Sequence, residues 1–208
     1  VVYDGIKIMP AAENSSCFAR EQMGISGDVF TVGDVGALTK EKGHEVIIRA
    51  AAAVLRRGIK LKLIIAGSGA MEKKLKKYVS EKNIEDSVLF TGFRKDILQL
   101  FPAFDIFVNA SESEGLGTSI LDAMASGCAV VASDAGGIPE IIKDASNGFL
   151  FKHVDAVTLT EKIIKLAGDE DLRKAFAEAG RKTAEKFSAE KTSEGTLSVY
   201  REVLNDRV

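Results

Sequence analysis

The sequence predicts an α/β protein built on a doubly wound, mostly parallel sheet. Short apolar runs rich in branched and aromatic residues alternate along the chain with segments of helical periodicity. Glycines follow several of the apolar runs, as is typical where a strand turns directly into a helix. Ligands of such sheets bind at the carboxyl ends of the strands, so a site is expected in the loops that follow them.

The composition indicates one domain. The 208 residues are 46% hydrophobic, which is enough for one sizeable core. The formal net charge of −2 provides no basic field, so nucleic acid is not an expected partner. Cys17 and Cys128 lie far apart without metal-ligand spacing, which favours a reduced, cytoplasmic protein, and Cys128 is expected in the core. The chain begins at Val1 rather than Met, without the features of a signal peptide, and we expect a fragment.

The first elements are an extended piece at residues 1–6 and a short helix at 19–23, ended by Gly24. The first strand is expected at 29–33, and a helix follows at 41–57. One apolar stripe along this helix is formed by Val46, Ile47, Ala50, Ala51, Val54 and Leu55.

Lys42 lies at the start of that predicted helix, where a cation is unfavourable for the helix dipole. This placement indicates a lysine that serves an anion, and a solvated lysine is the alternative. Gly33 and Gly36 loosen the loop before it.

The elements expected next are a strand at 62–66, a helix at 71–82, a strand at 87–91 and a short amphipathic helix at 96–101. The Gly-Ser-Gly sequence at 67–69 fits a phosphate loop or simply a tight turn from strand to helix. Residues 92–94, Gly-Phe-Arg, end the third strand.

The strongest indication of a site is a strand, a glycine-rich loop and a helix start between residues 105 and 127. After a strand at 105–109, Gly115 and Gly117 let main-chain N–H groups approach a ligand. A helix is expected from Thr118 to a stop at Gly127, and its first N–H groups suit a phosphate. Two carboxylates, Glu114 and Asp122, flank this start. As alternatives, Ser119 and Asp122 have the spacing of a capping box, and Glu114 fits a solvated loop acid.

The remaining elements are a strand at 129–132, a helix at 138–142, a strand at 149–151 and helices at 156–167, 170–186 and 189–205. In the last helix, Leu197, Tyr200, Val203 and Leu204 stand at helical spacing. This helix is expected either to expose part of its apolar face or to be mobile. His44 and His153 have no obvious partners, and no metal site is expected.

Two acids eight positions apart surround an E-G-F-G-like loop at Glu114-Gly115-Leu116-Gly117. Further ordered segments lie around this loop and after it, at residues 111–113, 120–127, 130–133, 136–140 and 147–150. Together these segments resemble the donor-binding C-terminal domain of retaining GT-B glycosyltransferases of family 4, the group 1 type. The resemblance covers nearly all of the chain but about half of a complete member. It therefore implies that residues 1–208 are one nucleotide-sugar-binding domain, the Rossmann-like C-terminal half of a GT-B fold, with the N-terminal acceptor domain absent.

The resemblance implies transfer of a hexose-like sugar from a UDP-, GDP- or ADP-sugar to a glycan, lipopolysaccharide or other lipid-linked or glycoconjugate acceptor. Retention of configuration and independence of metal or other cofactors are also implied, and the isolated chain is expected to be inactive. A cytoplasmic location is expected, and a peripheral position at the inner face of the membrane, through the absent domain, stays open. The alternatives are a catalytically weakened nucleotide-binding or interaction module and, more distantly, a sugar-nucleotide epimerase with this architecture.

By the same resemblance, Glu114 is the catalytic candidate near the transferred sugar, Lys42 faces the donor diphosphate, and Asp122 accepts from ribose hydroxyls. The full set of expected substrate-binding residues is Gly36, Lys42, Phe93, Arg94, Gly115, Leu116, Gly117, Thr118, Ser119, Asp122 and Glu140. Two departures from the family pattern motivate the weakened module. Ala37 stands where an arginine is usual, and Asp122 stands where glutamate is usual.

Overall fold

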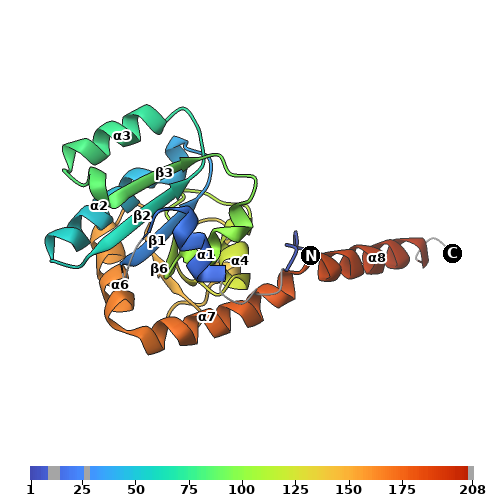
Figure 1. The fold of residues 1–208 in the computed structure, drawn as a ribbon. Coiled ribbons are helices and arrows are strands. Elements are labelled where there is room, and N and C mark those ends of the chain that lie inside the picture. The colour runs from blue at the N-terminus through green and yellow to red at the C-terminus, as the bar shows by residue number, and fades with distance from the viewer. Residues whose placement is uncertain (9–14, 26–28, 206–208) are drawn as a thin grey trace.

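Six parallel strands form the centre of the structure, a computed structural model that describes residues 1–8, 15–25 and 29–205 (Figure 1). They are β1 (Phe30–Val35), β2 (Leu61–Ala66), β3 (Val88–Gly92), β4 (Ile106–Asn109), β5 (Ala129–Ser133) and β6 (Phe149–Phe151). Their order across the sheet is β3-β2-β1-β4-β5-β6, and every pairing is parallel. The predicted doubly wound fold is confirmed.

Helices cover both faces of the sheet. They are α1 (Ser15–Gln22), α2 (His44–Arg56), α3 (Glu72–Glu81), α4 (Thr118–Ala125), α5 (Ile138–Ile141), α6 (Ala156–Gly168), α7 (Glu170–Ala184) and α8 (Ala189–Asn205). Apolar side chains of α2, α3 and α6 form one core with one face of the sheet, and those of α1, α4 and α5 form a second core on the other face. Along β2, Leu63 and Ile65 enter the first core and Ile64 enters the second, because successive side chains of a strand point to opposite faces. Cys128 is buried in the second core, as predicted.

Two predicted helices differ in the structure. The helix expected from Glu41 begins at His44, because Gly43 takes a left-handed conformation with φ of +67°, and the Lys40–Lys42 segment forms a separate 3-10 turn. Residues 96–101, expected as one helix, contain the 3-10 turn Ile97–Gln99, and a second such turn follows at Phe101–Ala103. Pro102 lies in that second turn, and a proline has no backbone N–H to continue a helix.

Smaller differences concern helix starts and ends. The first helix begins at Ser15 instead of Ala19, and α7 ends at Ala184 before a 3-10 turn at Glu185–Phe187. The capping box considered at the start of α4 is not formed, since Gly117 is the N-cap residue and no side chain caps the helix.

The last helix extends away from the sheet beside the N-terminus (Figure 1). None of its residues is buried, and Leu197, Tyr200 and Leu204 are 52%, 63% and 65% exposed, so the predicted exposure of its apolar face is confirmed. The N-terminal segment runs along its start, where Ile6 bridges to Ser188. Among residues 1–8, 15–25 and 29–205, no helix has the length and hydropathy needed to cross a bilayer.

The tight approach at Gly43 leads to a prediction about stability. A Cβ atom at this position would lie well inside van der Waals contact with the carbonyl oxygen of Ala110, and the φ of +67° is itself unfavourable for other residues. Gly43→Ala is therefore expected to lower the free energy of unfolding by about 3 kcal/mol. Gly58→Ala is the matched control, because Gly58 also has a positive φ of +80° but a Cβ added there would meet nothing within 4 Å. This control is expected to lose only about 1 kcal/mol in urea unfolding. Equal losses in the two variants would contradict the assignment of the close contact.

Candidate functional site

The order of strands reverses at the centre of the sheet, between β1 and β4. From β1 the chain crosses to β2 on one side, and from β4 it crosses to β5 on the other. The loops after these two strands therefore diverge and leave a crevice at the carboxyl ends of β1 and β4, the usual ligand position in an open α/β sheet. We call residues 36–43 the β1 loop and residues 110–117 the β4 loop.

The two loops are held against each other at the crevice. The backbone N–H of Glu112 donates to the carbonyl of Glu41 at 2.7 Å. Lys42 Nζ lies 2.6 Å from Glu114 Oε1, and the two side chains are 27% and 12% exposed. The structure thus brings together two predicted site residues that are 72 positions apart in the sequence.

Glu114 is held by more than this ion pair. Its Oε1 also accepts hydrogen bonds from Ser111 Oγ at 2.7 Å and from Asn109 Nδ2 at 3.2 Å. Burial acts to raise the pKa of Glu114, but the bonds from Lys42, Ser111 and Asn109 more than offset it, so the pKa is lowered. Glu114 is therefore an ionised carboxylate in a fixed position, suited to accept hydrogen bonds or to stabilise positive charge.

A second glycine-rich loop, which follows β5 and contains Gly136 and Gly137, packs against the β4 loop. Gly137 N–H donates to the carbonyl of Glu114 at 3.0 Å. Gly136 has φ of +56°, and a Cβ atom there would overlap the same carbonyl oxygen; a Cβ at Gly137 would overlap that of Gly115. A side chain at either position would displace the β4 loop, so these two glycines allow Glu114 to lie where it does.

The start of α4 contains the remaining central candidates. Gly117, with φ of +80°, precedes Thr118 and Ser119, and the first N–H groups of a helix have no partner within the helix. Asp122 lies one turn further along. Burial raises the pKa of Asp122 to about 6, because charging a carboxylate away from water is unfavourable. Hydrogen bonds donated by a ligand would therefore stabilise the ionised form of this carboxyl.

The peripheral candidates lie around this centre. Phe93 is 72% exposed after β3, and the Arg94 guanidinium donates two hydrogen bonds to Asp96, at 2.8 and 2.6 Å. Glu140 accepts a hydrogen bond of 2.6 Å from the Tyr3 hydroxyl. Gly36 N–H donates to the carbonyl of β2 residue Ala66, which fixes the start of the β1 loop. Leu116 packs against the second core, and Gly115 is exposed.

The expectation that His44 has no partner is wrong. Its Nδ1 lies 2.6 Å from Asp34 Oδ2 and its Nε2 lies 3.0 Å from the carbonyl oxygen of Ala37. Burial acts to lower the pKa of His44, but the charge and hydrogen bond of Asp34 raise it by more. The sequence does contain one indication of this pair, since Asp34 is a carboxylate inside an otherwise strand-like run. His44 follows ten positions later, after a loop whose path the sequence does not show.

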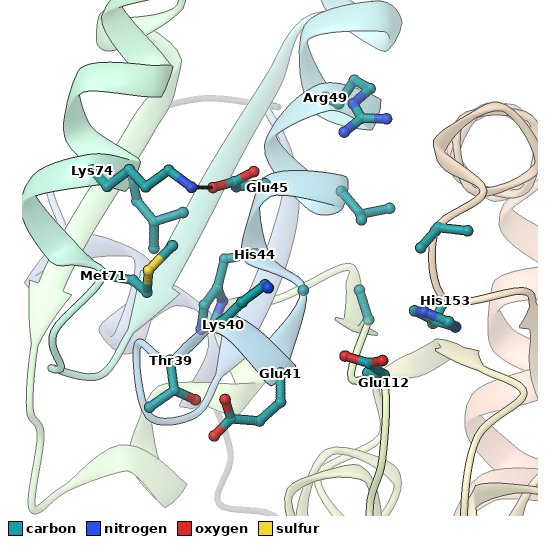
Figure 2. Close-up of a pocket in the computed structure, with 15 residues that line it drawn as sticks. Thr39, Lys40, Glu41, His44, Glu45, Arg49, Met71, Lys74, Glu112 and His153 are labelled. Atoms are coloured by element: carbon teal, nitrogen blue, oxygen red, sulfur yellow. Dashed lines mark ion pairs between the residues drawn. The ribbon is translucent and has the colours of Figure 1, made fainter.

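A pocket of about 350 Å³ lies beside the β1 loop, between the starts of α2 and α3 and the loop after β6 (Figure 2). Lys40, Arg49 and Lys74 provide positive charge around it, and Lys74 pairs with Glu45 at 2.7 Å. The other charged or ionisable residues of its lining are Glu41, Glu112, His44 and His153. Lys42, Glu114 and Asp122 are not among the lining residues, although both loops contribute to the lining, the β1 loop through residues 39–41 and 43 and the β4 loop through Ala110 and Glu112. Within the described ranges, no group of three or more His, Cys, Asp or Glu side chains is placed to hold a metal ion.

Comparison with known proteins decides the family. Residues 17–183 match the family model described as "Glycosyl transferases group 1". The chain belongs to this glycosyltransferase family. Its sequence is 34% identical over 181 residues to "Putative glycosyltransferase EpsD" of Bacillus subtilis, covering 87% of this chain and 48% of that protein. The glycosyltransferase chain spans about half the length of the curated relatives it matches.

Solved structures agree with the GT-B assignment of this glycosyltransferase chain. HepE from Anabaena, in complex with UDP, has a TM-score of 0.90 at 26% identity, over 97% of this chain and 57% of that chain. The C-terminal domain of a "Glycosyl Transferase Group 1 Family Protein (LpcC)" from Francisella tularensis has a TM-score of 0.80 at 30% identity. This match covers 89% of the present chain and 100% of the other.

Proposed function

We propose that this chain is the donor-binding domain of a glycosyltransferase and that it holds the diphosphate of a nucleotide sugar in the crevice between β1 and β4. The observation that carries the proposal is the meeting of Lys42 and Glu114, at 2.6 Å, beside the N-terminus of α4. The UDP and UDP-glucose complexes of HepE support it, because that protein shares the fold over 97% of this chain.

The charges of the crevice suit departure of a nucleoside diphosphate. As the bond from sugar to phosphate breaks, negative charge grows on the diphosphate. The Lys42 ammonium and the N–H groups of Thr118 and Ser119 would stabilise that charge. Lys42 then exchanges Glu114 for phosphate, which leaves the Glu114 carboxylate free to orient the sugar and to stabilise positive charge developing on it.

The remaining residues contact the nucleoside in this proposal. Asp122 accepts hydrogen bonds from the ribose hydroxyls, with a side chain one methylene shorter than the glutamate of the family pattern. Phe93 and Arg94 border the base, and for this Arg94 must share or leave Asp96. Gly36 and Gly115 leave room for the ligand, while Leu116 and Glu140 line its edge.

For the complete protein we propose a C-terminal donor domain at residues 1–208 and an N-terminal acceptor domain, with the isolated chain inactive in transfer. The LpcC domain, which matches over its whole length, supports the division into domains. Retention of configuration, independence of metal, a glycan or lipid-linked acceptor in polysaccharide or lipopolysaccharide synthesis, and a cytoplasmic position at the membrane face follow from the resemblance to family 4.

One observation favours a second candidate, a binding module with weakened transfer. Ala37 in the β1 loop is exposed and provides no cation where the family pattern has arginine. Binding of nucleotide without transfer by the full-length protein would favour this module, and epimerisation of a free nucleotide sugar would favour the more distant epimerase.

The test is a calorimetric titration of the 208-residue chain with UDP, GDP and ADP in the absence of metal. We expect saturable binding of one nucleotide, which identifies the base, and weaker binding by Lys42→Ala and Asp122→Ala. If folded chain and full-length protein both fail to bind at millimolar nucleotide, the proposed donor site is refuted.

Restoring the arginine gives a further prediction. Ala37→Arg is expected to tighten nucleotide binding about tenfold, since a charge-assisted bond to phosphate contributes roughly 1.5 kcal/mol or more. Ala175→Arg, on the exposed surface of α7, adds the same charge away from the crevice and is expected to leave the affinity unchanged. Equal gains in the two variants would show a general effect of net charge.

A further inference from the structure

A buried polar pair closes the base of the β1 loop. Asp34, near the end of β1, and His44, the first residue of α2, are 3% and 2% exposed. Their side chains meet at 2.6 Å, and the other ring nitrogen of His44 lies 3.0 Å from the carbonyl oxygen of Ala37. The imidazole of His44 thus joins the strand β1, the start of the β1 loop and the helix α2.

The two ring nitrogens face oxygens that accept hydrogen bonds, a carboxylate and a backbone carbonyl. A neutral imidazole has a single N–H, so both contacts are satisfied together only by the doubly protonated ring. The bond to Ala37 is therefore maintained by the negative charge of Asp34, which favours the second proton on the ring.

The loop that this pair closes contains Lys42. Two further backbone hydrogen bonds hold this loop: the Leu38 N–H donates to the carbonyl of Ser68, and the carbonyl of Glu41 accepts from the Glu112 N–H. Lys42 stands two residues before His44, with Gly43 between them in a conformation that allows a sharp turn. A shift of the Ala37 carbonyl or of the first turn of α2 would therefore move Lys42.

We propose that Asp34 and His44 are positioning residues, which hold the β1 loop so that Lys42 Nζ stands against Glu114. The claim that this placement matters for the donor diphosphate rests on the proposed function. The claim that the pair positions Lys42 does not rest on it, and each claim has its own measurement.

The first measurement follows Glu114 in the absence of ligand. Its pKa, lowered by Lys42, is read by NMR titration of the ¹³C-labelled side-chain carboxyl. In Asp34→Leu, and separately in His44→Gln, Lys42 is expected to leave Glu114 and the Glu114 pKa is expected to rise toward its ordinary value. Asp34→Leu is similar in size and offers neither a charge nor a hydrogen-bond partner, so it removes the bond that ties the His44 ring to β1.

The matched control is Thr31→Val at the opposite end of β1. Thr31 is fully buried, and its hydroxyl oxygen lies 2.8 Å from Asp105 Oδ2 and 2.6 Å from the carbonyl oxygen of Ala103, either of which can accept its one proton. This variant is expected to destabilise the fold without moving Lys42. If all three variants lower the Tm and the Glu114 pKa stays low in each, the pair is only structural and the proposal is overturned.

The second measurement is binding of UDP-glucose to the same variants. UDP-glucose is the probe because it carries both the diphosphate and the sugar of the proposed kind of donor. Asp34→Leu and His44→Gln are expected to weaken binding about tenfold, and Thr31→Val to leave it unchanged. Absence of binding of UDP-glucose, and of UDP, GDP and ADP, by the wild-type chain and by the full-length protein would refute the donor site alone. The Glu114 pKa would still decide the positioning role.

Discussion

Lys42→Met is expected to weaken binding of the nucleotide by about 10- to 100-fold, since a hydrogen bond to a charged group contributes roughly 1.5–3 kcal/mol. Methionine keeps the length of the side chain and removes its charge. The same substitution removes the strongest of the bonds that lower the pKa of Glu114, so that pKa should rise in the free protein. Calorimetry measures the affinity, and carboxyl NMR measures the pKa.

Lys40 provides the matched control for this result. It belongs to the same 3-10 turn as Lys42 but lines the pocket of Figure 2, to which Lys42 and Glu114 do not contribute. Lys40→Met removes an equal charge two residues away and is expected to change the affinity less than about twofold at roughly 0.15 M salt, where charges near the surface are screened. A similar loss in both variants would mean that Lys42 acts through the general field of the protein and not through contact.

Asp122→Asn is expected to stabilise the fold while weakening nucleotide binding. The folded pKa of about 6 lies above the ordinary value of 3.8, so the protonated carboxyl contributes stability that is present below pH 3.8 and lost as the pH rises through 6. At about pH 8 the full shift corresponds to roughly 3 kcal/mol, which partial exposure reduces to about 1–2 kcal/mol. The gain from asparagine should be about half as large at about pH 5. Urea unfolding at the two pH values measures it.

Binding should change in the opposite direction. Loss of the charged acceptor is expected to weaken nucleotide binding about tenfold at about pH 8. Asp122→Glu, which keeps the charge and restores the reach of the family residue, is expected to bind at least as tightly as the wild type. If Asp122→Asn lowers stability at this pH, or if it leaves the affinity unchanged, Asp122 does not have the proposed role.

The sequence predicts the strands well because each is a short apolar run, and strands buried on both faces need such runs over their whole length. The start of α2 is predicted less well. Its apolar stripe begins after Gly43, but the charged residues before it are equally compatible with a first helical turn. The helix begins at His44 because Gly43 takes a left-handed conformation, and the close approach of Ala110, from a distant part of the chain, leaves no room there for a side chain.

The site shows the same division between local and distant information. Lys42 and Glu114 are individually recognisable from their neighbours in sequence, whereas their ion pair depends on β1 and β4 being adjacent strands. The pairing of His44 with Asp34 is missed, because neither residue has a distinctive neighbour and the β1 loop must fold back for them to meet.

The adjacency of β1 and β4 also has a consequence for the order of folding. The strands β1, β2 and β3, with α2 and α3 between them, form from segments that follow one another, but β4 must return across that whole stretch to pair with β1. Pairings between distant segments form slowly, because the entropy of closing the loop is lost before the contact is gained. The crevice is therefore completed late in refolding, and binding of a fluorescent nucleotide should recover with the slowest phase, after most helical circular dichroism has returned.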